Sequence, residues 1–325
     1  MYKNFRFALL IIASLFAVSA NGEPMAYSVN SDSGNLDTED SLYLIDLFTG
    51  ADQRRGLLST GIVDEIRRDT EGLAFAPDGT LWGIDDSSQT LFPINVTSGA
   101  VKLQNEIPLP TFKSGGGHDF GMTFSCDGSL FVTSVATRTL YRLDMTGKAE
   151  IIGSEGALGE NISAIAAYGN PTRLYGLGNG QFQDGQTDSP NLYSISETTG
   201  VATLIGALGN EAGEYNQGGM AFDSEGGLWA ITDRRIINNS IEDLPSQILN
   251  IDVSTGVASL VSNTSEVGFE SLAISPPSAC SGNVGGGGTG TSQFETIPTL
   301  NPAGRLLAIC ILMLAGMTVL RKRLS

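Results

Sequence analysis

The sequence predicts an all-β fold, a five-bladed β-propeller, on the strength of three observations. A strand phrase that ends in glycine recurs five times along the chain. A second block with the pattern of a β-hairpin precedes four of these phrases. The N-terminal region contains only the later strands of such a unit, whereas the C-terminal region contains a lone first strand. Repeats of about 50 residues with four short strands are typical of propeller blades.

The strand phrase has apolar residues at alternate positions, which places them on one face of an extended strand. A polar residue and a Thr-Gly, Ser-Gly or similar pair follow, and the glycine provides the positive φ of a tight turn. The closing glycines are 49, 48, 53 and 56 residues apart. The five copies are Leu42–Gly50, Leu91–Gly99, Leu140–Gly147, Leu192–Gly200 and Ile248–Gly256.

The hairpin block consists of an apolar strand, an Asp-Gly or similar turn, and a second strand that carries a large aromatic residue. Trp82 and Trp229 occupy the same place in their copies, which predicts that they are core residues between sheets and not a platform for sugars. The four copies begin near Glu71, Phe120, Ile162 and Gly218.

The two ends of the repeat region complement each other. Residues 25–58 provide the later strands, and 270–275 provide a first strand. A fifth blade built from both ends would close the ring and leave no open edge. We therefore predict a propeller over 26–277; an open all-β sandwich is the alternative, but it gives no reason for the lone first strand.

The N-terminus predicts a secretory signal peptide over 1–22. Lys3 and Arg6 precede an apolar run at 7–18, which is too short for an ordinary membrane span, and small residues follow. We expect a signal helix here, cleavage after Ala20 or Gly22, and export of the mature chain.

The exported part is strongly acidic. The stretch from Glu23 to Glu295 holds all 35 acidic residues and 12 of the 18 basic ones, a formal charge of −23. Such a charge disfavours nucleic acids and favours cations or cationic partners, although solubility alone also accounts for it. Of the three cysteines, only Cys126 and Cys280 lie in the exported part, and we expect them to stay unpaired because they fall two blades apart.

Beyond the repeats the composition changes. Residues 278–296 are rich in Gly, Ser and Thr, which predicts a flexible linker. An apolar run at 306–320 and a basic end, Arg321, Lys322 and Arg323, predict a transmembrane helix in the inner membrane with the propeller outside. Fifteen apolar residues span only about 22 Å as a helix, so flanking residues must help.

This tail, 297–325, resembles the IPTL-CTERM sorting signal of bacteria that carry an exosortase-type processing enzyme. The matching features are the motif Ile297, Pro298, Thr299 and Leu300, then Gly304, the apolar span and the basic end. Ala303 stands where the family usually has Trp. The resemblance implies that an exosortase-type membrane enzyme recognises and cuts the tail, so that the protein reaches the cell surface or the medium. A plain C-terminal anchor is the alternative.

Reactive groups for catalysis are few. The chain has one histidine, His118, and lacks G-x-S-x-G, CxxC and HExxH motifs. His118 follows three glycines, which predicts a solvated loop residue and not a catalytic base. The loops at Asp85–Asp86 and 184–188 lack regular calcium-ligand spacing, so we expect them to be solvated too.

A metal site at the propeller mouth is better supported. Residues just before each first strand should point into the central channel, and they include Glu71, Asp119 and Glu270. Carboxylates that converge from several blades are ligands for Ca²⁺. The other interpretation, which we favour from the sequence alone, is that these acids cap strand ends and bind water at the channel mouth.

The run Asp69–Ala74 also resembles the D-x-E-G-L-A opening of propellers in phytase-like esterases, and the Glu-Gly opening of gluconolactonase-like propellers. In the latter group the glutamate binds a metal, and Glu71 is the matching residue here.

Two functions remain open from the sequence. One is a non-catalytic surface or matrix protein that binds an unknown ligand or partner at the propeller mouth. The other is a calcium-dependent lactonase or phosphoesterase that uses Glu71, Asp119 and Glu270 around one ion.

Overall fold

The computed structural model describes residues 24–61, 66–109, 112, 117–179, 190–237, 240–275 and 280. Its contacts divide the chain into two units. One unit, Pro24–Ser292, contains all the strands. The other consists of Met1–Glu23 and Gln293–Ser325 and lies outside the described residues, so the predicted signal helix, transmembrane helix and sorting motif do too. Within the described residues, no helix is long and apolar enough to cross a membrane.

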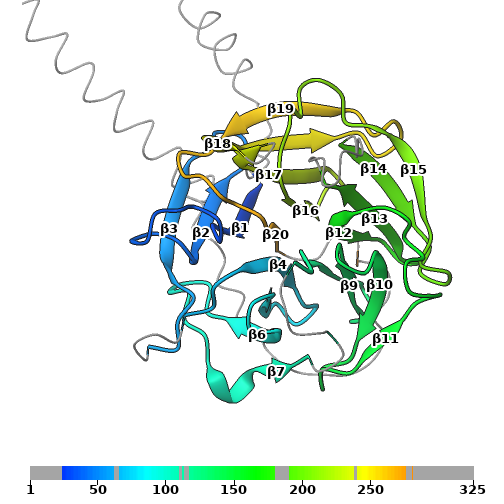
Figure 1. Cartoon of the computed structure of the whole chain (residues 1–325), viewed down its shortest axis with the longest axis horizontal. Helices are drawn as coiled ribbons and strands as arrows, with labels where there is room; N and C mark the ends of the chain where they lie inside the picture. Colours follow the sequence, from blue (N-terminus) through cyan, green and yellow to red (C-terminus); the bar gives the residue numbers. More distant parts are fainter. Residues whose placement is uncertain are drawn as a thin grey trace, which may run out of the picture. The chain divides into compact units, whose positions relative to one another are not determined.

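Five four-stranded antiparallel sheets surround a central axis, as the sequence predicts (Figure 1). Each blade is given from its inner to its outer strand. Blade 1 is β4 (Thr70–Phe75), β5 (Leu81–Asp85), β6 (Thr90–Ile94) and β7 (Ile107–Pro108). Blade 2 is β8 (Gly121–Phe124), β9 (Leu130–Ser134), β10 (Thr139–Leu143) and β11 (Ala149–Ile151). Blade 3 is β12 (Ile162–Tyr168), β13 (Arg173–Gly178), β14 (Asn191–Ile195) and β15 (Ala202–Ala207). Blade 4 is β16 (Gly218–Phe222), β17 (Leu228–Ile237), β18 (Ser240–Ile251) and β19 (Ala258–Asn263). Blade 5 is β20 (Ala273–Ile274), β1 (Met25–Val29), β2 (Ser41–Asp46) and β3 (Asp52–Leu57).

Blade 5 joins the two ends of the repeat region, which confirms the predicted ring closure. In the register of β1 and β20, Ala26 lies opposite Ile274. Ser28 Oγ donates a hydrogen bond to the carbonyl of Ser271, and the N–H of Val29 donates to Ser271 Oγ at 3.1 Å. Every inner strand is therefore paired within a blade, and the seam leaves no open edge.

The glycine-ended phrase forms the third strand and the following turn in every blade. In blade 5, Asp46 Oδ1 accepts hydrogen bonds from the N–H groups of Phe48 (2.9 Å) and Thr49 (3.1 Å). The N–H of Gly50 donates to the Asp46 carbonyl at 2.8 Å, and Gly50 has a φ of 73°. A polar residue precedes the turn in the repeated phrase because its short side chain accepts hydrogen bonds from the backbone N–H groups of the turn.

Apolar residues on facing sheets form the core between blades. Trp229 is 4% exposed in the cluster between blades 4 and 5, and Trp82 packs against the cluster between blades 1 and 2. Their interpretation as core residues is confirmed.

The inner strands approach one another closely along the axis. A Cβ atom built on Gly219 would lie 2.1 Å from the backbone nitrogen of Leu272. Only a residue without a side chain permits this spacing. The residues at this position, in the inner strands or just before them, are all small: Gly72, Gly121, Ser163, Gly219 and Ser271.

The structure contains a disulfide bond between Cys126 and Cys280, with Cα atoms 5.1 Å apart. The expectation that these cysteines stay unpaired is wrong. Cys126 lies in the turn between β8 and β9, at the C-terminal end of an inner strand, and Cys280 follows the inner strand β20 by six residues. Six residues extend up to about 20 Å, which suffices to cross from blade 5 to blade 2 near the axis.

Candidate functional site

Among the described residues, seven acidic side chains gather at one end of the channel, and we call this end the mouth. It lies where the inner strands begin and the strands beside them end. Loops from different blades therefore meet there, although they are far apart in the sequence. The mouth consists of Asp32, Asp69, Glu71, Asp86, Asp119, Asp233 and Glu270.

The first group of carboxylates at the mouth is Asp69, Glu71 and Asp86, from blade 1. One oxygen atom from each lies within 4.8 Å of the others. Glu71 Oε2 accepts a hydrogen bond from the N–H of Phe120 at 2.7 Å, and Asp86 Oδ2 accepts one from the N–H of His118 at 2.9 Å. Asp86 is 1% exposed, and its Oδ1 atom has no hydrogen-bond partner. An oxygen that is buried and unpaired is costly unless a cation or a proton compensates it.

Asp119 lies next to this group, as the sequence predicts for Glu71 and Asp119. Its carboxyl group lies beside that of Glu71, and its Oδ1 atom accepts a hydrogen bond from Gln217 Nε2 at 3.0 Å. Its φ of 44° is rare for a residue with a side chain. Blades 1, 2 and 4 thus meet at this point.

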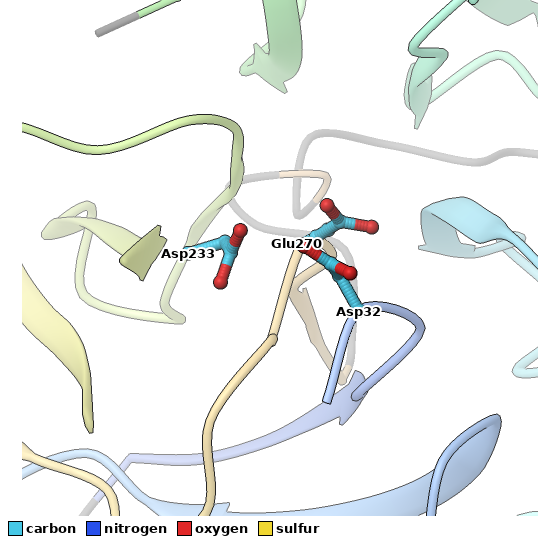
Figure 2. Close-up of side chains that lie close together, drawn as sticks. All are labelled: Asp32, Asp233 and Glu270. Atoms are coloured by element: carbon cyan, nitrogen blue, oxygen red, sulfur yellow. The ribbon is translucent and has the colours of Figure 1, made fainter. Parts of the chain in front are cut away.

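The second group of carboxylates is Asp32, Asp233 and Glu270, whose ligand oxygens also lie within 4.8 Å of one another. Figure 2 shows the three side chains together, each on a separate segment of the chain. Glu270 therefore belongs to a different group from Glu71. The two glutamates nevertheless occupy equivalent positions in the repeat, since each is followed in the sequence by a small residue, then Leu and Ala.

Burial and the mutual repulsion of the carboxylates raise the pKa values of acidic residues at the mouth. Burial, followed by the charge of neighbouring carboxylates, raises the pKa of Asp69 to about 6. Burial raises the pKa of Asp119 to about 6 and of Asp233 to about 7. The pKa values of Glu71 and Glu270 lie well above the ordinary range for the same reason. Buried carboxylates that lie close together destabilise one another when ionised, and either a proton or a cation between them relieves this cost.

Two expectations about the loops at the mouth are wrong. His118 is 5% exposed, because its ring stacks parallel to that of Phe120 at 5.0 Å and Nδ1 lies 3.0 Å from Ser134 Oγ. Asp85 and Asp86 are also buried. Asp85 Oδ2 accepts a hydrogen bond from the N–H of Ser88 at 2.7 Å, and Asp86 Oδ2 accepts one from the N–H of His118. The other acidic loop, 184–188, and the sorting residues 297–300, 304 and 321–323 lie outside the described residues.

Sequence reasoning missed Asp32, Asp86 and Asp233 as members of the mouth. A comparison of second strands would have revealed two of them, because Leu81–Asp86 (LWGIDD) and Leu228–Asp233 (LWAITD) both end in aspartate at the same position. Asp32 has no such counterpart.

No family model and no curated protein matches the chain. Among solved structures, a catalytically inactive virginiamycin B lyase from Staphylococcus aureus with quinupristin is similar at 18% identity, over 74% of this chain and 71% of that one, with a TM-score of 0.40. A protein described as a putative 6-phosphogluconolactonase from Bacteroides uniformis is similar at 12% identity, over 74% and 83% of the two chains, with a TM-score of 0.40. A chain of the nidogen–laminin complex is similar at 10% identity, over 79% and 99%, with a TM-score of 0.45. Similarities at this level do not indicate what this chain binds or does.

Proposed function

We propose that this chain is an exported calcium-binding β-propeller that engages a ligand or partner through its acidic mouth. The observation that carries the proposal is the Asp69–Glu71–Asp86 group, in which the buried Asp86 Oδ1 has no partner. Asp119, whose carboxyl group lies beside Glu71, adds a further carboxylate. Carboxylate oxygens in this number and at this spacing suit Ca²⁺, which takes six to eight oxygen ligands. The ion would supply a positive charge at which an anionic or carbonyl group of a ligand can bind.

Replacement of Glu71 tests this proposal. We expect Glu71→Gln to weaken Ca²⁺ binding at the Asp69–Glu71–Asp86 site about 100-fold or more, because an amide of the same shape removes one anionic ligand. The measurement is calorimetric titration of the purified full chain with CaCl₂ after removal of bound ions with EGTA.

The matched control is Glu225→Gln, in the exposed turn between β16 and β17 at the opposite end of the channel. It should bind Ca²⁺ as the unmodified chain does. Absence of binding to the unmodified chain, or equal affinities of the Glu71 and Glu225 variants, would refute the proposal.

A calcium-dependent lactonase or phosphoesterase remains the second candidate function. The observation that favours it is the position of Asp119, whose carboxyl group lies beside Glu71 and accepts a hydrogen bond from Gln217 Nε2 at 3.0 Å. A carboxylate placed there is a candidate general base for a water molecule at the ion. Hydrolysis of a lactone or phosphoester by the calcium-loaded chain, abolished in Asp119→Asn, would decide for the enzyme. A binding module should bind Ca²⁺ equally well and hydrolyse neither.

The export and sorting of this chain are also proposals, and they rest on the sequence pattern of its two ends. We expect a tagged chain in cells to be cleaved near the motif at 297–300 and then to leave the inner membrane. Replacement of Ile297–Leu300 by four alanines should block both steps, because the processing enzyme no longer recognises the tail. A chain that stays uncleaved in the membrane with the motif intact contradicts the proposal and favours a plain anchor.

A further inference from the structure

The second carboxylate group, Asp32, Asp233 and Glu270, is separate from the site proposed above. Asp32 follows β1, Asp233 lies within β17, and Glu270 precedes β20 (Figure 2). Their ligand oxygens lie within 4.8 Å of one another, and the group shares no residue with the Asp69–Glu71–Asp86 group.

Local structure directs Asp233 into this group. The register between β17 and β18 shifts between Thr232 and Arg234, so Asp233 has no partner in that ladder. Instead its N–H donates to the carbonyl of Gln217 at 2.8 Å. Such a bulge re-aims a side chain at the end of a strand.

Asp233 provides a second, independent observation that points to a bound cation. Its side chain is fully buried. Its Oδ1 atom accepts a hydrogen bond from the N–H of Arg235 at 3.0 Å, whereas Oδ2 has no hydrogen-bond partner. Native proteins rarely leave a buried carboxylate oxygen unpaired, and a bound cation satisfies such an atom.

The other two carboxylates are held in place from outside the group. Glu270 Oε2 accepts a hydrogen bond from Ser31 Oγ at 2.7 Å. Asp32 Oδ1 lies 2.6 Å from Arg235 Nη1, and Arg235 Nε lies 3.4 Å from Asp243 Oδ1. Three carboxylates and one guanidinium leave a formal charge of −2, which one divalent cation balances.

We propose that Asp32, Asp233 and Glu270 form a second divalent-cation site, which stabilises the seam of the ring, the place where the N- and C-terminal parts of the repeat region pair in blade 5. Asp32 belongs to the N-terminal part of the chain, Glu270 to the C-terminal part, and Asp233 to the neighbouring blade 4. A cation bound by all three links both ends of the repeat region and two adjacent blades. Because such a site exists only in the closed ring, binding of the cation stabilises the closed ring. Hard oxygen ligands select Ca²⁺ or a similar ion.

The experiment is calorimetric titration of the purified, EGTA-treated full chain with CaCl₂, combined with thermal unfolding with and without Ca²⁺. The unmodified chain should bind two equivalents. Asp233→Asn should weaken one of them about 100-fold or more and reduce the rise in Tm that Ca²⁺ causes. The amide keeps an oxygen for the N–H of Arg235, and circular dichroism verifies that the variant is folded. Glu270→Gln is a second variant with the same expected result.

The matched control is Asp243→Asn, because Asp243 contacts Arg235 but is 62% exposed and lies outside the group. It should retain two equivalents. The second site would be overturned, and the proposed function left intact, by either of two results. One is that Asp233→Asn and Glu270→Gln both still bind two equivalents of Ca²⁺. The other is that the unmodified chain binds a single equivalent, which only Glu71→Gln abolishes. A single equivalent lost in Asp233→Asn and kept in Glu71→Gln would support the seam site and overturn the first one. Absence of any binding would overturn both.

Discussion

The full chain with Cys126→Ser and Cys280→Ser should unfold about 10–20 °C below the unmodified chain. The bond joins residues 154 positions apart in the sequence. A closed loop of this length removes enough entropy from the unfolded chain to stabilise the native state by about 5 kcal/mol. For a domain of about 250 residues, each kcal/mol corresponds to about 2–4 °C in Tm. Thermal unfolding followed by circular dichroism, under non-reducing conditions, measures the difference.

Cys310→Ser is the control for this prediction, since it removes the remaining cysteine and leaves the bond intact. Its Tm should equal that of the unmodified chain. The disulfide lies at the C-terminal ends of the inner strands, opposite the mouth, so Ca²⁺ affinity at the mouth should not change in the double variant. A double variant that unfolds within about 2 °C of the unmodified chain would show that the bond does not constrain the unfolded ensemble as the loop model requires.

Gly50→Ala should cost about 3 kcal/mol of stability. Gly50 has a φ of 73°, a conformation that costs other residues about 1–2 kcal/mol. A Cβ atom there would also lie 1.9 Å from the carbonyl oxygen of Asn263 in blade 4. A backbone carbonyl cannot change its position as easily as the end of a flexible side chain, so we expect the clash to add about 1–3 kcal/mol to the loss of stability. Urea unfolding of the full chain measures the loss.

Gly128→Ala separates the two contributions. Gly128 has a φ of 85°, but a Cβ atom there would meet nothing within 4 Å. We expect only the conformational cost of about 1–2 kcal/mol. If Gly50→Ala and Gly128→Ala lost equal amounts of unfolding free energy, the contact between blades 5 and 4 would accommodate the added Cβ atom without a loss of stability.

The close approach of Gly50 recurs around the ring. Each closing glycine of the repeated phrase faces a backbone carbonyl in or beside the outer strand of the preceding blade, and a Cβ would lie between 1.9 and 2.6 Å from it. The pairs are Gly50 with Asn263, Gly99 with Gly56, Gly147 with Pro108, Gly200 with Ile152, and Gly256 with Gly206. The glycine that the sequence explains as a turn former is therefore also the contact point between neighbouring blades.

The sequence alone determined the number of blades, the order of their strands and the closure of the ring. These features repeat with a period of about 50 residues, and each depends on local rules: alternation within a strand, a polar residue and a glycine in a turn. The positions of Glu71, Asp119 and Glu270 at the openings of inner strands followed from the same period. Local rules suffice because a blade is a contiguous meander, apart from the one at the seam.

Only the tertiary structure decided which carboxylates meet, which side chains are buried and which cysteines pair. Asp233 reaches Glu270 and Asp32 because a bulge in β17 turns it toward the neighbouring blade. His118 is buried because Phe120 offers its ring face. Cys280 reaches Cys126 because inner strands lie close together at the axis. The carboxylates and the cysteines are brought together by the closed ring, which places segments far apart in the sequence next to one another at the axis. A one-dimensional repeat does not encode these contacts.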